Sequence, residues 1–182
     1  MSLTVDRQST YFHKQIEQTV GQWEGSRTYE SVKTGKITKV SNRFEVTLDR
    51  DKTACANLEK LHDLPSGTFS YVINIYWKSH DRDTQKRLSE GSMIMGYHNG
   101  WLYRDRGYVT DMPVLSQVEM PSPDHMLIRT FYEGVTTLGD ETVAYEENFR
   151  WAGDHRLRTV LAWDKNHQLT LMGQYMERKI AA

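Results

Sequence analysis

Residues 69–77 read Phe69-Ser70-Tyr71-Val72-Ile73-Asn74-Ile75-Tyr76-Trp77, and every odd position of this stretch is apolar. Successive side chains of a β-strand point to opposite faces of the sheet, so this alternation predicts a strand with one buried face. We expect Phe69, Tyr71, Ile73, Ile75 and Trp77 to face the interior of the protein.

The rest of the chain divides into similar runs. A helix is predicted over Ser9–Val20 and a second, short helix over Thr53–Asp63; between and after them lie roughly nine or ten short β-rich runs. Turn residues such as Lys33–Lys36, His98–Gly100 and Gly139–Asp140 separate these runs. The predicted strands begin near Trp23, Ile37, Phe69, Gly91, Trp101, Val114, Met126, Thr142, Arg156 and Leu169. This spacing predicts an all-β fold with short helices, an antiparallel up-and-down barrel with an N-terminal helix, in one domain over residues 1–182.

Composition narrows the class of protein. The chain has 182 residues, 38% of them hydrophobic, and a formal net charge of -1, so neither disorder nor a nucleic-acid-coating surface is indicated. Its single cysteine, Cys55, rules out an intramolecular disulfide framework and favours a reducing compartment, which we take to be the cytoplasm. No apolar run approaches the roughly 20 residues that span a bilayer, and Met1–Asp6 lacks a signal-peptide core.

Two charged side chains are predicted to point inward. Arg27 shares the face of Trp23 and Tyr29, and Glu147 shares the face of Tyr145, whereas Glu146 points outward. A charge inside a barrel costs several kcal/mol unless it has a partner. Arg27 and Glu147 therefore form a structural ion pair with each other or with Arg156, or they await a polar ligand. The alternation alone leaves both interpretations open.

Other candidate chemistry is weakly supported. The Trp and Tyr side chains of the inward face are explained by core packing as well as by a ligand platform. Cys55 lies between Ala54 and Ala56 in the predicted second helix, so we interpret it as a packing residue. The seven histidines are scattered without the spacing of a zinc site, each is expected at the surface, and no metal is proposed.

The first predicted strand opens with a short motif. Gly21-Gln22-Trp23, which follows the predicted helix, resembles the Gly-x-Trp start of lipocalins. In lipocalins an arginine of the last strand packs against that tryptophan, and the resemblance assigns this place to Arg178. It implies a barrel of the lipocalin or fatty-acid-binding-protein type.

A wider set of motifs resembles the S-type (CpcS/CpeS) phycobiliprotein lyases. The resemblance covers the chain from Trp23 to Ile180. The matching segments, in order, are Trp23 with Ser26-Arg27-Thr28, Trp77, Glu90-Gly91-Ser92, Leu102 to Tyr108, Pro113-Val114, Glu146-Glu147, Arg156-Leu157-Arg158 and Glu177-Arg178. It implies an enzyme that binds a phycobilin, a linear tetrapyrrole such as phycocyanobilin or phycoerythrobilin, without a covalent bond. The pigment would then be attached through a thioether to a cysteine of a phycobiliprotein subunit.

The resemblance also implies site residues and partners. Glu147 and Arg156 are the expected catalytic residues, with Arg156 or Arg158 holding a propionate of the pigment. The remaining ligand-binding residues are expected to be Arg27, Trp77, Arg158, Glu177, Trp23 and Tyr145. The acceptor would be phycocyanin, allophycocyanin or phycoerythrin, in the cyanobacterial cytoplasm or plastid stroma, and the chain would need no cofactor of its own.

Three functions remain open at this stage. The first is the lyase itself, working alone or as a homodimer or heterodimer. The second is a carrier of bilins without transfer activity, or the noncatalytic half of a heterodimeric lyase. The third is an unrelated lipocalin or fatty-acid carrier, against which the two inward charges argue.

Overall fold

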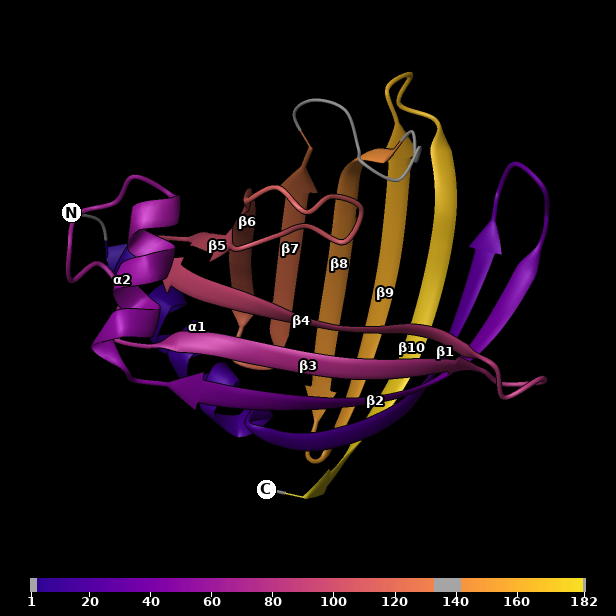
Figure 1. The fold of residues 1–182 in the computed structure, drawn as a ribbon, viewed down its shortest axis with the longest axis horizontal. Helices are drawn as coiled ribbons and strands as arrows, with labels where there is room; N and C mark the ends of the chain where they lie inside the picture. Colours follow the sequence, from indigo (N-terminus) through magenta and orange to yellow (C-terminus); the bar gives the residue numbers. More distant parts are fainter. Residues whose placement is uncertain (1–2, 133–141, 182) are drawn as a thin grey trace.

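The computed structural model describes residues 3–132 and 142–181, and within them the chain forms ten β-strands and two α-helices (Figure 1). The elements are α1 (Leu3–Thr19), β1 (Gly21–Ser31), β2 (Ile37–Asp49), α2 (Lys52–Leu61), β3 (Val72–Asp81), β4 (Arg87–His98), β5 (Trp101–Arg104), β6 (Val114–Ser122), β7 (His125–Phe131), β8 (Thr142–Ala152), β9 (His155–Asp164) and β10 (Leu169–Ala181).

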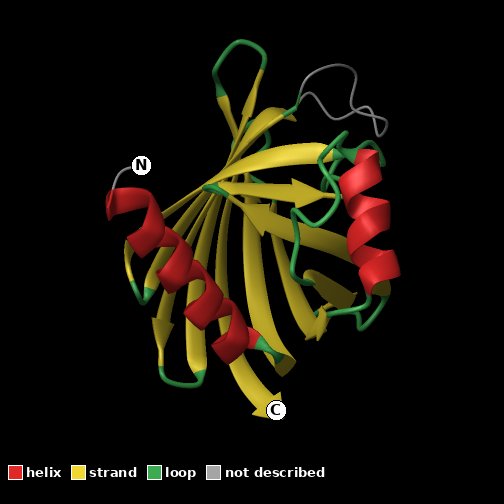
Figure 2. Ribbon diagram, turned by 90° about the vertical axis from the view of Figure 1, so that its left-hand side faces the viewer, coloured by secondary structure: helices red, strands yellow, loops and turns green. Residues whose placement is uncertain are grey.

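The strands form one closed antiparallel barrel. Each strand pairs with its neighbours in chain order, and β1 pairs with β10 to close the sheet. This confirms the predicted up-and-down barrel, in which closure leaves no unpaired strand edge. Figure 2 shows α1 and α2 on separate sides of the barrel. In the part of the chain that the structure describes, no helix combines the length and the hydropathy of a membrane span.

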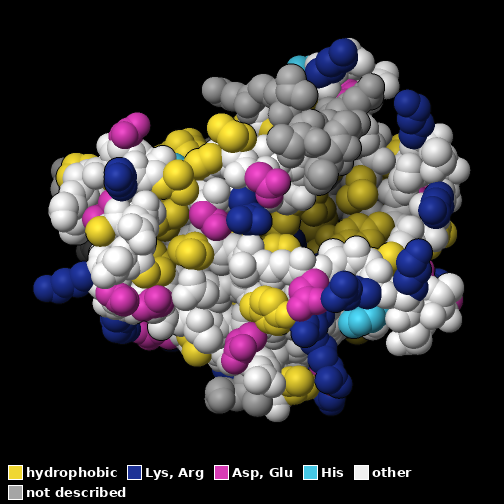
Figure 3. All heavy atoms as spheres, in the orientation of Figure 1, with side chains coloured by type: hydrophobic (Ala, Val, Ile, Leu, Met, Phe, Trp, Pro, Cys, Tyr) yellow, Lys and Arg dark blue, Asp and Glu magenta, His cyan; other side chains and the backbone are white. Residues whose placement is uncertain are grey.

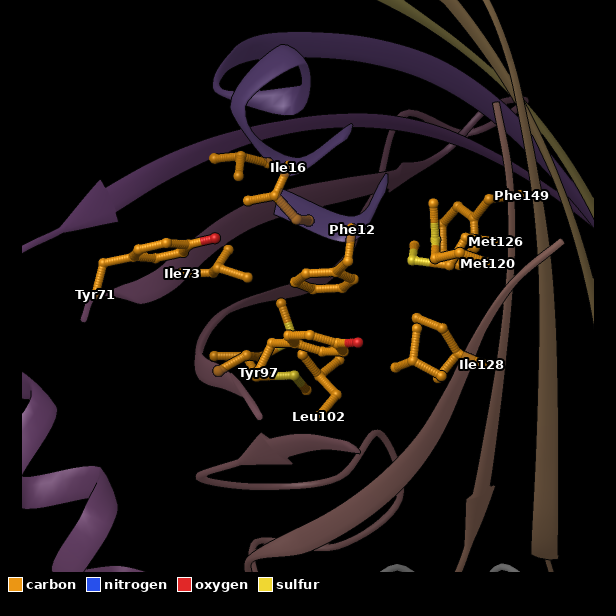
Figure 4. Packing of buried hydrophobic residues seen from close by; sticks show 14 of the residues in the cluster. Phe12, Ile16, Tyr71, Ile73, Tyr97, Leu102, Met120, Met126, Ile128 and Phe149 are labelled. Carbon is orange, nitrogen blue, oxygen red and sulfur yellow. The ribbon is translucent and has the colours of Figure 1, made fainter. Parts of the chain in front are cut away.

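Helix α1 covers the end of the barrel at which β1 begins. The ring of Phe12 stacks on Tyr97 with centroids 3.9 Å apart, and the indole nitrogen of Trp23 donates a hydrogen bond of 2.8 Å to the carbonyl oxygen of Thr19. Figure 4 shows Phe12 from α1 among Tyr97, Leu102 and other apolar side chains of the surrounding strands. The apolar core therefore fills the barrel at this end.

Helix α2 packs on the outside of the barrel. Its buried residues Cys55 and Leu58 contact Phe69 and Val72. Phe69 is therefore buried, but beneath α2 and not inside the barrel as predicted. The reason is that β3 begins only at Val72, so the alternation that places Tyr71 and Ile73 in the barrel core does not extend back to Phe69.

Five of the ten predicted strand starts coincide with the structure, while other boundaries differ, such as that of β4, which begins at Arg87 and not near Gly91. Helix α1 begins at Leu3, ahead of the predicted Ser9, and α2 ends at Leu61, two residues before the predicted Asp63. Strands β2, β5, β6, β8 and β10 begin at the predicted residues. The predicted turn at Gly139–Asp140 lies outside the described residues.

Candidate functional site

A cavity of about 300 Å³ lies inside the barrel, toward the end opposite α1. Its wall consists of Arg27, Tyr29, Phe44, Ile75, Trp77, Ser89, Met93, Tyr108, Tyr145, Arg156, Arg158 and Tyr175. Figure 3 shows a hollow with hydrophobic side chains on this side of the molecule. The cavity thus combines aromatic walls with three guanidinium groups.

Glu147 lies behind this wall, fully buried on β8. Its carboxylate pairs with the guanidinium of Arg158 and, at 3.1 Å, with Nη2 of Arg104. The Tyr108 hydroxyl donates a third hydrogen bond of 3.3 Å to Oε1 of Glu147. The carboxylate therefore contacts two guanidiniums and one hydroxyl. The guanidiniums come from β9 and β5, and the hydroxyl comes from the segment that follows β5.

Glu177 on β10 forms a second buried ion-pair group. Both Nε and Nη2 of Arg156 lie within 2.7 Å of its Oε2, while Nη2 of Arg27 lies 3.8 Å from its Oε1. The Arg156 guanidinium also lies 5.1 Å from the ring centres of Trp23 and Phe44. Such stacking favours arginine over other cations. The edge of the Arg156 guanidinium is therefore bound by the Glu177 carboxylate, and aromatic rings pack around it.

Both carboxyl groups are held in the ionised form. Burial raises the pKa of Glu147, but the neighbouring Arg158 and Arg104 together lower it by more than burial raises it. The pKa therefore lies below its ordinary value. Burial likewise raises the pKa of Glu177, and Arg156, Arg158 and Arg27 together bring it below the ordinary value. The interior therefore holds charged carboxylates and charged guanidiniums in contact.

Several polar atoms of this site have no hydrogen-bond partner among the described residues. They are Nε of Arg27, Nε and Nη1 of Arg104, Nε of Arg158 and Oε1 of Glu177. A buried donor or acceptor without a hydrogen-bond partner costs about 1–3 kcal/mol, so such atoms are uncommon in the cores of folded proteins. Two of the residues with such atoms, Arg27 and Arg158, line the cavity, while Arg104 and Glu177 lie behind its wall in ion pairs with its neighbours.

The structure brings the residues predicted for the site together, with different pairings. Glu147 faces inward and Glu146 faces outward, where it pairs with Arg129 at 2.9 Å. The prediction that Arg27 and Glu147 pair with each other or with Arg156 is wrong. The register of neighbouring strands sets Arg156 directly opposite Glu177 and Arg158 diagonally opposite Glu147. The β1–β10 closure brings Arg27 beside Glu177, and Arg104 reaches Glu147 from β5 across the barrel.

Arg178 does not contact Trp23, so that assignment is also wrong. In the β1–β10 register Arg178 lies opposite Glu24, one residue from the inward-facing Trp23, and the two side chains pair at 2.6 Å on the outer face. The cation over Trp23 comes from Arg156 on β9.

Sequence reasoning did not assign Arg104, Tyr108 and Tyr175 to the site, nor the wall residues Phe44, Ser89 and Met93. It placed Tyr29 on the inward face without assigning it to the site. Arg104 is 1% exposed, and its position two residues after buried Leu102 is the signal that could have revealed it. Strand β5 has only four residues, too few for an alternation to stand out.

The other residues weighed from the sequence lie apart from the cavity. Cys55 lies on the face of α2 that packs on the barrel, where burial raises the pKa of its thiol, in agreement with a packing residue. The expectation that every histidine lies at the surface is wrong: His125 is buried, and Nδ1 of His13 lies 2.5 Å from the Tyr71 hydroxyl at the edge of the core.

The closed barrel, the helix at one end and the charged cavity define a lipocalin-like ligand-binding protein. The chain belongs to the CpeS-like protein family, whose model matches residues 12–180. The CpcS 2 protein of Nostoc sp. (strain PCC 7120), whose name describes a phycocyanobilin lyase, is 30% identical over 170 residues, which cover 91% of this chain and 88% of that protein. The phycocyanobilin lyase subunit CpcS of Picosynechococcus sp. (strain PCC 7002) is 25% identical over 79% of this chain and 74% of its own.

Solved structures share the fold. The S-type phycobiliprotein lyase CPES from Guillardia theta aligns with a TM-score of 0.72 at 14% identity, covering 96% of this chain and 94% of that chain. Rv2717c from M. tuberculosis aligns with a TM-score of 0.57 at 9% identity, covering 91% of this chain and 94% of its own. At these identities the likeness concerns the barrel and not the reaction.

Proposed function

We propose that the protein is a phycobiliprotein chromophore lyase, which binds a linear tetrapyrrole without a covalent bond and promotes its thioether attachment to a cysteine of a phycobiliprotein subunit. The family membership supports the class of reaction. The observation that carries the proposal is the cavity itself, whose aromatic wall also holds three arginines, two of them with a guanidinium nitrogen that lacks a partner among the described residues.

The charge of the interior suits a ligand with two carboxylates. The linked charged groups at the cavity are two buried carboxylates, three buried guanidiniums and the partly exposed guanidinium of Arg27, which leaves two positive charges in excess. A bilin carries two propionates, and an arginine binds a carboxylate through two parallel hydrogen bonds. Arg27 and Arg158 are the proposed contacts, because both line the cavity and both have an unpartnered Nε.

Arg156, Glu147 and Glu177 are proposed to act behind these contacts. Arg156 is already bound by Glu177 and enclosed by rings, so it positions the Glu177 carboxylate, whose Oε1 has no hydrogen-bond partner among the described residues. Glu147 becomes reachable for a pyrrole N–H when Arg158 turns toward a propionate. An acceptor at the pyrrole nitrogens favours the protonated pigment, in which the ring-A ethylidene is a better electrophile.

The flat walls of the cavity are proposed to hold the pyrrole rings. Trp77 and Tyr145 line the cavity, and Trp23 supports it from below through Arg156. The cavity volume of about 300 Å³ is at the lower limit for small-molecule sites. Part of the pigment is therefore expected to extend through the open end, where the acceptor cysteine can reach it.

The reaction needs no covalent enzyme intermediate. The acceptor thiolate adds to the ethylidene carbon of ring A, the carbon–carbon double bond opens, and a proton moves to the adjacent ring carbon. The barrel contributes by holding one conformation and presenting one face of the pigment. Phycocyanobilin is the first candidate because the names of the two relatives refer to a phycocyanobilin lyase and to a phycocyanobilin lyase subunit, and phycoerythrobilin is the second.

An attachment assay with matched variants tests this proposal. The purified protein is mixed with phycocyanobilin and the apo-subunits of phycocyanin, allophycocyanin and phycoerythrin, and covalent pigment is measured on the denatured subunit. We expect Glu147→Gln and Arg156→Ala to bind bilin at least tenfold more weakly and to attach it poorly. Glu146→Gln, next in the chain but outward-facing, is the control and should behave as wild type. Unchanged affinity and transfer in both site variants would remove the assignment.

A second candidate is a partner subunit of a heterodimeric lyase, or a bilin carrier. The name of the Picosynechococcus relative, a lyase subunit, favours this alternative. A chain of this kind takes up pigment but leaves the acceptor cysteine free until its partner is added. Repeating the assay with and without other lyase subunits distinguishes the two functions.

A further inference from the structure

Three hairpins lie side by side at the open end of the barrel (Figure 1). They are residues 31–39 between β1 and β2, residues 81–87 between β3 and β4, and residues 164–168 between β9 and β10. The backbone nitrogen of Val32 donates to the Thr170 carbonyl at 3.0 Å, and that of Arg82 donates to the Lys39 carbonyl at 2.9 Å. These bonds join the first hairpin to strand β10 and strand β2 to the second hairpin. Because β9, β10, β1, β2, β3 and β4 are neighbours in this order, the three hairpins follow one another along an arc of the barrel rim.

The arc is strongly basic. Its three segments contain three acids, Asp81, Asp83 and Asp164, against seven cations. The cations are Lys33, Lys36, Lys39, Arg82, Lys86, Arg87 and Lys165, and we call this set the basic rim. The excess of four positive charges contrasts with the net charge of -1 of the whole chain. In Figure 3, Lys and Arg side chains gather beside the hollow on its right-hand side.

The cations of the basic rim are free to meet a partner. Arg87 pairs with Glu90 at 2.8 Å, whereas the other six form no ion pair with described residues. Two of the three acids are used within their own turns: Asp81 accepts from the backbone nitrogens of Asp83 and Thr84, and Asp164 accepts from those of Asn166 and Gln168. The turns are therefore ordered by acids that face the backbone, while the lysines point to solvent.

We infer that the basic rim docks an acidic surface of the acceptor protein beside its cysteine. This inference rests on the proposed function and names the chemistry of its partner. Helix α1 and the apolar core fill the other end of the barrel, so the acceptor thiol has to approach the pigment from the end at which the rim lies. Opposite charges around the approach raise the association rate and orient the two proteins.

Charge reversal tests the rim. In Lys33→Glu/Lys36→Glu two exposed lysines of the first hairpin are reversed, and Lys52→Glu/Lys60→Glu on α2 is the control with the same change of net charge. Each variant is loaded with phycocyanobilin, and attachment is measured against the concentration of apo-subunit at low and high salt. We expect the rim variant to bind bilin as wild type but to lose at least tenfold in kcat/KM for the subunit at low salt. The difference should vanish near 0.5 M salt, at about the ionic strength that screens exposed charges.

Three results would contradict docking at the basic rim. The first two are a rim variant with the kcat/KM of wild type and a control variant that loses as much kcat/KM as the rim variant. The third is a loss confined to the rate of bilin uptake, which would mean that the lysines steer the pigment and not the subunit. Direct binding of the apo-subunit is measured in parallel. A wild-type chain that binds the subunit through the rim but attaches no pigment removes the lyase proposal alone, so the two failures are distinguishable.

Discussion

Replacing Glu147 by glutamine should destabilise the fold by an amount set by its two arginines. Glutamine keeps the volume of the side chain but removes the charge that compensates Arg104 and Arg158. Arg104 is 1% exposed and has two nitrogens without a partner among the described residues, so it cannot turn to solvent. Breaking a buried ion pair on one side costs about 3–5 kcal/mol. We expect Glu147→Gln to lower the unfolding free energy by this amount.

The same reasoning gives a pH dependence with a definite sign. The pKa of Glu147 is lowered in the folded protein, so its contribution is fully present above the unfolded pKa, about 4.5, and is lost as the pH falls through the folded value. The difference in stability between wild type and Glu147→Gln should therefore be constant near neutral pH and shrink below about pH 4.5. Other carboxyls titrate in both proteins, and their effects cancel in the difference.

Urea unfolding followed by tryptophan fluorescence measures both effects. The control is Glu146→Gln, whose half-exposed pair with Arg129 is worth at most about 1 kcal/mol. Adding Arg104→Met to Glu147→Gln removes one of the two guanidiniums left without their carboxylate. The double variant should therefore recover at least about 1 kcal/mol of the unfolding free energy. A loss below 1 kcal/mol, no recovery in the double variant, or a difference that stays constant down to pH 3 would refute the reasoning.

Two further predictions compare residues at the site with residues under or on α2. A Cβ atom at Gly91 would lie 2.7 Å from the Trp77 ring, so Gly91→Ala should displace the indole, cost about 1–3 kcal/mol and weaken bilin binding measured by absorbance. Gly96→Ala, which meets Phe69 under α2 at the same distance, should cost a similar amount and leave bilin affinity unchanged; equal loss of affinity in both would contradict this. Cys55→Ala should retain full attachment activity, since that buried thiol lies outside the cavity, and loss of attachment in a folded variant would refute it.

The sequence by itself determined the barrel and the inward direction of the main site residues. Alternation with a period of two depends only on the pleat of a strand, so it correctly turned Glu147 inward and Glu146 outward. The same alternation gave the wrong location for Phe69. The pleat that alternates side chains exists only within a strand, and β3 begins at Val72. Family motifs pointed to Arg156 and Glu177, which the structure joins in one ion pair.

Only the tertiary structure decided which charges meet. Glu147 on β8 contacts Arg158 on β9 and Arg104 on β5, and the latter lies 43 residues away along the chain. A local pattern tells which face a side chain takes, but not the register of its strand against a neighbour or the strand that it meets across the closed barrel. The register sets Arg158 beside Glu147, and only the closed barrel brings Arg104 to the same carboxylate. The tertiary structure likewise places Arg156 over Trp23, while Arg178 pairs with Glu24 on the outer face.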